Sequence, residues 1–126
     1  MNNSRPVNLD LGTVSFPITA IASILHRICA VISWVGIGFL LMALALALGS
    51  KESFDVMATM LQENLLAQIV TWGLLTAFGY YCMGTIKHII QDFGLFEDFQ
   101  GGKAISWVAI VAGVVISICA GVMIWA

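Results

Sequence analysis

Three long apolar stretches constrain this sequence more than any other feature. They run over residues 21–48, 65–90 and 104–125. A helix needs about 20 predominantly apolar residues to cross the roughly 30 Å hydrocarbon core of a bilayer. Lipid offers no partners for unpaired backbone groups, and none of the three stretches shows the alternation of a strand. We therefore predict an all-α integral membrane protein with three transmembrane helices.

The composition agrees with a membrane location. Of the 126 residues, 60% are hydrophobic and 10% are charged, whereas about 25% of the residues of an average soluble domain are charged. The net charge of −2 leaves no basic surface that would bind nucleic acid. We expect residues 1–126 to form a single transmembrane domain, with residues 1–20 as its polar N-terminal segment.

The basic residues predict the orientation of the chain. One side of the membrane would carry Arg5, Arg27, Lys87 and Lys103, and the other side only Lys51. Loops rich in lysine and arginine usually remain in the cytoplasm. The N-terminus and the connection over residues 91–103 are therefore expected to be cytoplasmic.

Polar residues gather at the cytoplasmic ends of the first two predicted helices. In the first helix, Ser23, His26 and Arg27 follow the spacing i, i+3, i+4 and share one face. In the second helix, one face contains Tyr81, Thr85, His88 and Asp92. Because the second helix returns to the cytoplasm, we expect His88 and Asp92 at the level of His26 and Arg27.

Ionisable residues within a membrane are functional candidates, and the two polar faces together favour a site. The alternative is structural, with long basic side chains extending to the lipid headgroups while their stems stay in lipid. For Lys87 alone we expect this alternative. A small transporter or channel would instead place ionisable groups near the middle of the bilayer.

The third predicted helix carries a small residue at every fourth position: Ala109, Gly113, Ser117 and Gly121. Such a stripe lets another helix approach closely. Three spans also enclose little volume by themselves. The stripe and the exposed polar face together predict a second membrane chain, and hence a hetero-oligomer in which the helices form one bundle.

Three segments resemble the cytochrome b membrane-anchor subunit of bacterial succinate dehydrogenase, respiratory complex II. They are RPVNLDL at 5–11, FPITAIASILHR at 16–27 and KHIIQDFG at 87–94. The resemblance covers nearly the entire chain. It implies a multi-pass subunit of the bacterial inner membrane that binds, with a smaller three-helix anchor subunit, the flavoprotein and iron–sulfur subunits.

The resemblance also implies a role in electron transfer from succinate to ubiquinone, in the tricarboxylic acid cycle and the respiratory chain. FAD and the iron–sulfur clusters would belong to the partner subunits, so this chain would hold no complete active site. Ser23 and Arg27 match the family's quinone-site serine and arginine. A hydroxyl can donate to a quinone carbonyl, and a guanidinium can stabilise the charge of the reduced ring. His26 and Asp92 are candidates for a proton relay, since histidine titrates near neutral pH.

The family binds haem b between the two anchor subunits, and here the sequence departs from its pattern. The family signature is a histidine ligand, three residues, glycine, an aliphatic residue, arginine and histidine. The corresponding stretch is YCMGTIKH, so that Tyr81 stands at the ligand position, Thr85 at the glycine position and Lys87 at the arginine position. Tyrosine does ligate haem iron in some proteins, although a phenolate favours ferric iron and lowers the potential.

The resemblance favours the presence of haem b, shared with the partner anchor subunit, and three outcomes stay open at this point. The partner's histidine could hold it together with a substitute ligand such as His26. It could be five-coordinate, or ligated by Tyr81. It could also be absent, with ubiquinone reduced directly from the nearest iron–sulfur cluster. In the first two cases, His26, Arg27 and His88 would lie on the side of the haem propionates. A purely structural anchor without haem and an anchor of a fumarate reductase are the alternative functions.

Overall fold

The computed structural model describes residue 12 and residues 14–126, so the motif over residues 5–11 and the basic Arg5 lie outside the described part. Within that part, all regular secondary structure is helical. Helices α1 (Ile18–Ala47), α3 (Leu65–Asp92) and α4 (Phe99–Trp125) are long and apolar enough to cross a membrane. The predicted all-α class with three candidate spans is confirmed.

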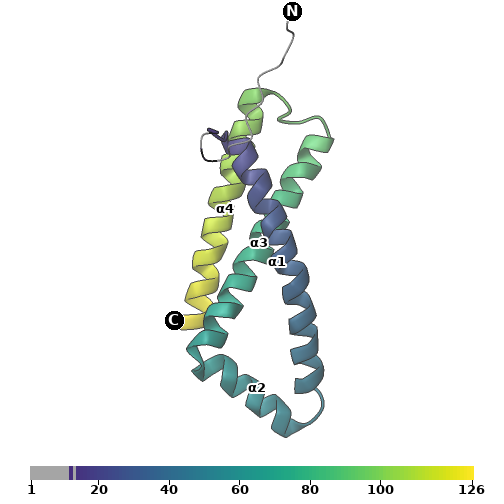
Figure 1. The fold of residues 1–126 in the computed structure, drawn as a ribbon, viewed down its shortest axis with the longest axis vertical. Helices are drawn as coiled ribbons and strands as arrows, with labels where there is room; N and C mark the ends of the chain where they lie inside the picture. The colour runs from purple at the N-terminus through teal and green to yellow at the C-terminus, as the bar shows by residue number, and fades with distance from the viewer. Residues whose placement is uncertain (1–11, 13) are drawn as a thin grey trace, which may run out of the picture.

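The connection over residues 49–64 forms a further helix, α2 (Lys51–Glu63), which the sequence analysis did not predict. The Ser50 hydroxyl accepts a hydrogen bond from the Ser53 N–H at 3.0 Å, and Glu52 lies in the first turn. An acceptor before the helix and an acidic residue in its first turn both stabilise the N-terminus. Helix α2 buries none of its residues. It joins the ends of α1 and α3 that lie far from the start of α1 (Figure 1).

Local sequence also determines where the other helices begin. Pro17 precedes α1 with extended backbone angles and has no N–H to leave unpaired. Asn64 and Asp98 cap α3 and α4 by accepting from the N–H groups of Ala67 and Gly101 at 3.0 and 3.2 Å. The loop between α3 and α4 turns at Gly94, whose φ of +79° suits glycine.

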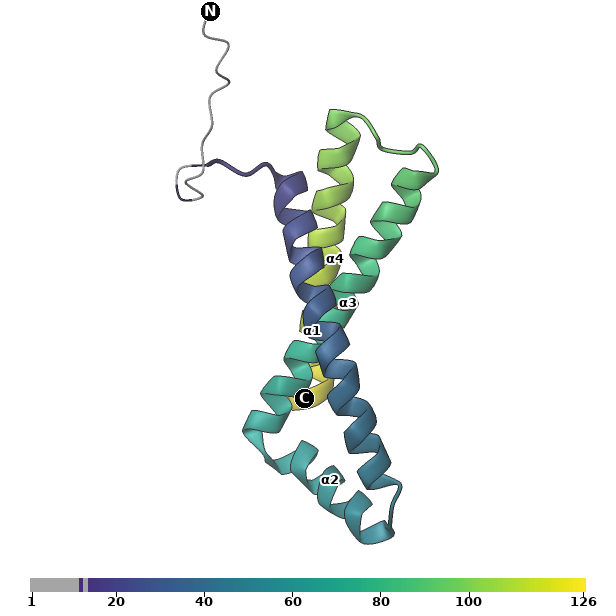
Figure 2. The ribbon, with the colours of Figure 1, turned by 45° about the vertical axis from the view of Figure 1, so that its right-hand side comes forward.

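Helix α3 contacts both other long helices. Helices α1 and α3 cross near their middles and separate toward α2, as Figures 1 and 2 show from two directions. The centre of the contact is Tyr80, whose hydroxyl donates to the Ala22 carbonyl of α1 at 2.9 Å. Its ring lies against Gly113 of α4, where an added Cβ would come within 2.7 Å of Cδ2. A single tyrosine thus joins all three long helices.

The small-residue stripe of α4 faces α3 of the same chain. Beside the contact at Gly113, the Ser117 hydroxyl accepts a hydrogen bond from Thr76 at 3.0 Å, and its carbonyl accepts from the Trp72 indole at 2.9 Å. Ala109 is buried, and Gly121 lies against Trp72. The stripe does allow close helix packing, but its use as an argument for a second membrane chain was wrong, because α3 already occupies it.

Large apolar side chains cover the outer faces of the long helices. Examples are Val31, Trp34 and Phe39 on α1 and Val108 and Met123 on α4, all of them exposed. In water such a surface would drive aggregation. In a bilayer it faces lipid or the apolar face of another membrane subunit.

Candidate functional site

The candidate site lies where the first half of α1 meets the second half of α3. Helix α1 supplies Ser23, His26 and Arg27, and α3 supplies Tyr81 and His88. The helices approach closely there because small residues lie between them. Ala22 and Gly84 are both buried.

His26 forms a hydrogen bond across the two helices. Its Nε2 lies 3.2 Å from the Thr85 hydroxyl oxygen, and that hydroxyl lies 2.8 Å from the Tyr81 carbonyl oxygen. A hydroxyl has one proton to donate, and the carbonyl can only accept. Thr85 therefore donates to Tyr81, and the Nε2–H of His26 donates to Thr85. In the neutral imidazole this leaves Nδ1 as the acceptor.

Two aromatic rings of α3 enclose the same imidazole. The Tyr81 ring stacks on His26 with 5.1 Å between the ring centroids and 20° between the planes. The His88 ring meets it at 5.2 Å and 62°. The imidazole also fills the space that Gly84 leaves open, where a Cβ would lie 2.9 Å from its Cγ. His26 thus lies between the levels of Tyr81 and His88 and is held from several sides.

The other predicted site residues make no ring contact with this cluster. Ser23 is half-buried, whereas Arg27 and Asp92 are exposed. Among the described residues, no hydrogen bond or ion pair involves the side chains of Ser23, Arg27 or Asp92. The structure therefore brings together His26, Tyr81 and His88, and leaves the polar atoms of Ser23, Arg27 and Asp92 available to other molecules.

Lys87 differs from its expected position. It is 7% exposed and shares a face of α3 with the buried Tyr80 and Gly84. Within residues 14–126 its ammonium has neither a hydrogen bond nor an ion pair. The expectation that Lys87 extends outward to the lipid headgroups was wrong, since its spacing of three and seven residues from Gly84 and Tyr80 directs it inward.

Two features of the ring cluster escaped the sequence analysis. Thr85 was placed on the polar face of the second helix and at a glycine position of the family, but its bond to His26 was not predicted, and Gly84 was not considered. A glycine inside a predicted helix is a detectable signal, because it often marks a close approach of two elements. Which side chain would enter the space was not readable from the sequence.

The residues at the axial position do not fit the haem ligation that the resemblance implies. Tyr81 offers only a phenol, and its ring lies face to face with His26. His26 uses Nε2 to hold Thr85. Among the described residues, no group of three or more histidine, cysteine or acidic side chains is placed to hold a metal ion.

A cavity of about 290 Å³ opens farther along the crossing of α1 and α3. It is almost entirely apolar, and its lining includes Ser33, Gly36 and Phe78. The Ser33 hydroxyl is buried and has no hydrogen-bond partner in the described part of the chain. This cavity lies on the α2 side of the ring cluster, away from Ser23 and Arg27.

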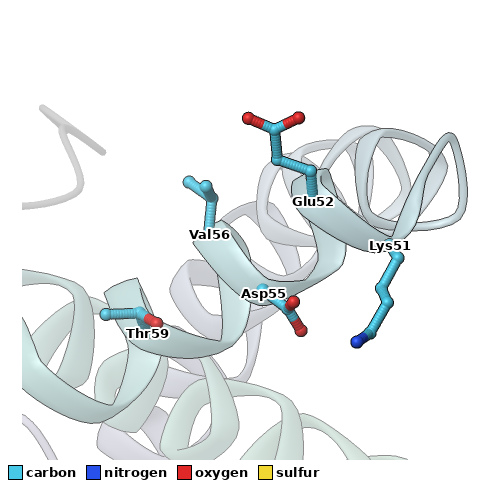
Figure 3. A pocket seen from close by; sticks show the side chains of 5 residues that line it. All are labelled: Lys51, Glu52, Asp55, Val56 and Thr59. Carbon is cyan, nitrogen blue, oxygen red and sulfur yellow. The ribbon is translucent and has the colours of Figure 1, made fainter.

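Another depression lies on α2, far from the start of α1 (Figure 1), and Figure 3 shows it from close by. Lys51, Glu52, Asp55, Val56 and Thr59 line it. Figure 3 shows the Glu52 and Val56 side chains on one side of the helix and those of Lys51 and Asp55 on another. All five residues are exposed, so the depression is a shallow feature of the surface and not a binding site with buried polar groups.

Comparisons with known proteins place this chain in a family of membrane subunits. Residues 1–120 match the family model described as the succinate dehydrogenase/fumarate reductase transmembrane subunit. A protein of Coxiella burnetii, named succinate dehydrogenase cytochrome b556 subunit, is 33% identical over 125 residues. That alignment covers 99% of this chain and the whole of the relative. The resemblance found in the sequence is confirmed: this chain belongs to the family of transmembrane subunits of succinate dehydrogenase and fumarate reductase.

Proposed function

We propose that this chain is the large membrane-anchor subunit of a succinate dehydrogenase and forms part of its ubiquinone-reduction site. With a smaller three-helix anchor subunit it would tether the flavoprotein and iron–sulfur subunits to the cytoplasmic face of a bacterial inner membrane. FAD and the iron–sulfur clusters would belong to those partners. The name of the Coxiella relative favours succinate dehydrogenase over fumarate reductase, since the family includes both.

The observation that carries the quinone assignment is that the side chains of Ser23 and Arg27 lack partners in their own chain. They follow each other by one helical turn on α1, and neither has a hydrogen bond or ion pair within the described chain. Polar groups at a membrane interface that lack partners in their own chain are available to a ligand or a neighbouring subunit. Ser23 is half-buried and Arg27 exposed, so the two side chains offer a sheltered donor next to an accessible cation.

These two groups suit the chemistry of quinone reduction. The Ser23 hydroxyl would donate a hydrogen bond to one quinone carbonyl and so fix the head group. The guanidinium of Arg27 would stabilise the negative charge that develops on the quinone oxygen as electrons arrive. Both residues belong to one continuous helix, which keeps their spacing constant while the ring changes charge.

Reduction also needs protons, and His26 and Asp92 are the candidates to supply them. His26 donates through Nε2 to Thr85, which leaves Nδ1 as the atom that can accept and pass on a proton. The exposed Asp92 would connect the site to the cytoplasm. A haem held by other subunits would find Arg27 and His88 exposed at this level, on the side assigned to its propionates.

A haem-free anchor is the second candidate function. The observation that favours it is the stacking of Tyr81, which stands at the family's ligand position, on His26. Ubiquinone would then receive electrons directly from the nearest iron–sulfur cluster, and the roles proposed for Ser23 and Arg27 would be unchanged.

Two substitutions in the intact complex test the quinone assignment. Arg27→Ala and Ser23→Ala should each lower succinate–ubiquinone activity, while succinate oxidation with an artificial dye and the assembly of the subunits persist. Ser33→Ala is a matched control for Ser23→Ala, because it removes a hydroxyl from the same helix in the separate cavity. Lys51→Ala is the control for Arg27→Ala at the far end of the molecule. Wild-type quinone reduction in both site variants would exclude these residues from the site.

A further inference from the structure

We infer that neither Tyr81 of α3 nor His26 of α1 supplies an axial ligand to a haem iron. The residues that would ligate it instead hold the two helices together. The inference rests on family membership and on the contacts around His26, and not on the proposed quinone site. It excludes the outcomes in which Tyr81 or His26 ligates the iron. A haem b held by ligands outside these two residues, or no haem b at all, remains.

Tyr81 lacks what an axial ligand at this position requires. A histidine offers a neutral nitrogen with a free lone pair, whereas a tyrosine must first lose a proton with an ordinary pKa of about 10. In the described chain no hydrogen bond or ion pair reaches the Tyr81 hydroxyl to stabilise a phenolate. Its ring faces the imidazole of His26 at 5.1 Å, which is the arrangement of a packing contact.

His26 does not serve as the substitute ligand of the iron either. Histidine reaches haem iron through Nε2, because Nδ1 is adjacent to the attachment of the side chain and would bring the porphyrin against the helix backbone. The Nε2–H of His26 points to Thr85 on α3 of the same chain. The Thr85 hydroxyl already donates its hydrogen bond to the Tyr81 carbonyl. Nε2 must therefore carry the hydrogen in its contact with Thr85. Nε2 therefore has no lone pair free for a metal.

Two of the three departures from the family signature, those at residues 81 and 85, contact the same imidazole. Tyr81, at the ligand position, stacks on it. Thr85, at the glycine position, accepts its hydrogen bond. The glycine stands one residue earlier, at Gly84, and its missing Cβ leaves the space that the imidazole fills. The departures at Tyr81 and Thr85 thus place an interhelical contact where the family has its ligand.

The test is spectroscopic and uses the intact, detergent-solubilised complex. The pyridine haemochrome assay gives haem b per complex, and reduced-minus-oxidised absorbance with ferric EPR gives the spin state of the iron. Tyr81→Phe removes the phenol oxygen but keeps the ring, and His26→Gln removes the imidazole but keeps an N–H donor for Thr85. We expect both variants to match the wild type in haem content and spin state. A wild-type complex without haem b also supports the inference.

Two results would overturn it. One is a loss of haem, or a change in its spin state, on Tyr81→Phe. The other is a conversion of low-spin to high-spin iron on His26→Gln. A shift in an absorbance band with unchanged content and spin state reports only a change in surroundings, and supports the inference. The succinate–ubiquinone activity of Arg27→Ala is a separate readout, so the quinone assignment and this inference can fail independently.

Discussion

The imidazole of His26 donates a hydrogen bond to Thr85 over 3.2 Å and thereby joins α1 to α3 at the level of the candidate site. This bond links residues that are 59 positions apart in the sequence. Together with the bond from the Tyr80 hydroxyl to the Ala22 carbonyl, it sets the rotation of α1 about its axis, and with it the direction in which Ser23 and Arg27 project. The geometry of the proposed quinone site therefore depends on His26, which is a candidate to supply protons there but not one of the two residues proposed to contact the quinone ring.

Thr85→Val should weaken the contact between α1 and α3. Valine keeps the shape of threonine but cannot accept from Nε2 of His26, and interhelical hydrogen bonds within membranes contribute about 0.6 to 2 kcal/mol. We expect a lower temperature for dissociation of the purified complex, measured by size-exclusion chromatography after heating. Thr85→Ser retains the hydroxyl and should stay near the wild-type value. Equal losses in both variants would argue against the hydrogen bond.

Gly84→Ala should be destabilising although alanine favours helices. The added Cβ would overlap the imidazole of His26, and overpacking of this kind costs about 1–3 kcal/mol. Gly73→Ala is the matched control, because a Cβ at Gly73 of the same helix meets nothing within 4 Å. We expect Gly73→Ala to assemble normally and Gly84→Ala to give less intact complex in the membrane fraction. Normal assembly of both variants would mean that the imidazole can leave its place freely.

Tyr80→Phe and Tyr81→Phe form a neighbouring pair with different expected outcomes. The Tyr80 hydroxyl donates to the Ala22 carbonyl at 2.9 Å, whereas the Tyr81 hydroxyl has no such bond within the described residues. Loss of the first should lower stability by about 1 kcal/mol, and loss of the second should change it little. Thermal denaturation of the complex in detergent compares them directly. A larger effect of Tyr81→Phe would contradict the central role assigned to Tyr80.

Gly113→Ala tests whether the stripe of α4 serves packing within the chain. A Cβ at this position would come within 2.7 Å of Tyr80 Cδ2, so α3 and α4 would have to separate. At Gly121 the nearest atom to an added Cβ is 3.5 Å away, which is an ordinary contact. We expect a clear loss of thermal stability for Gly113→Ala and little change for Gly121→Ala. If neither variant lost stability but both failed to bind the smaller anchor subunit, the stripe would be an intersubunit surface.

Local composition determined the membrane class and the three spans, because the transfer of a helix into lipid depends mainly on its own length and apolarity. Helical periodicity likewise placed Ser23, His26 and Arg27 on one face. The same reasoning missed α2, whose sequence is polar on average and was interpreted as a connection. Its signals were the capping serine at Ser50 and the acidic Glu52 beside it.

What only the tertiary structure decided is which side chain meets which. Periodicity gives the face of a helix but neither its rotation against a neighbour nor the level at which two helices cross. The stripe of α4 therefore suggested a second chain until α3 was found against it, and Lys87 was expected to point outward until its face proved to be the buried one. The same is true of His26. Its position at the membrane edge follows from the sequence, but its hydrogen bond to Thr85 forms only because α1 and α3 approach closely at Gly84.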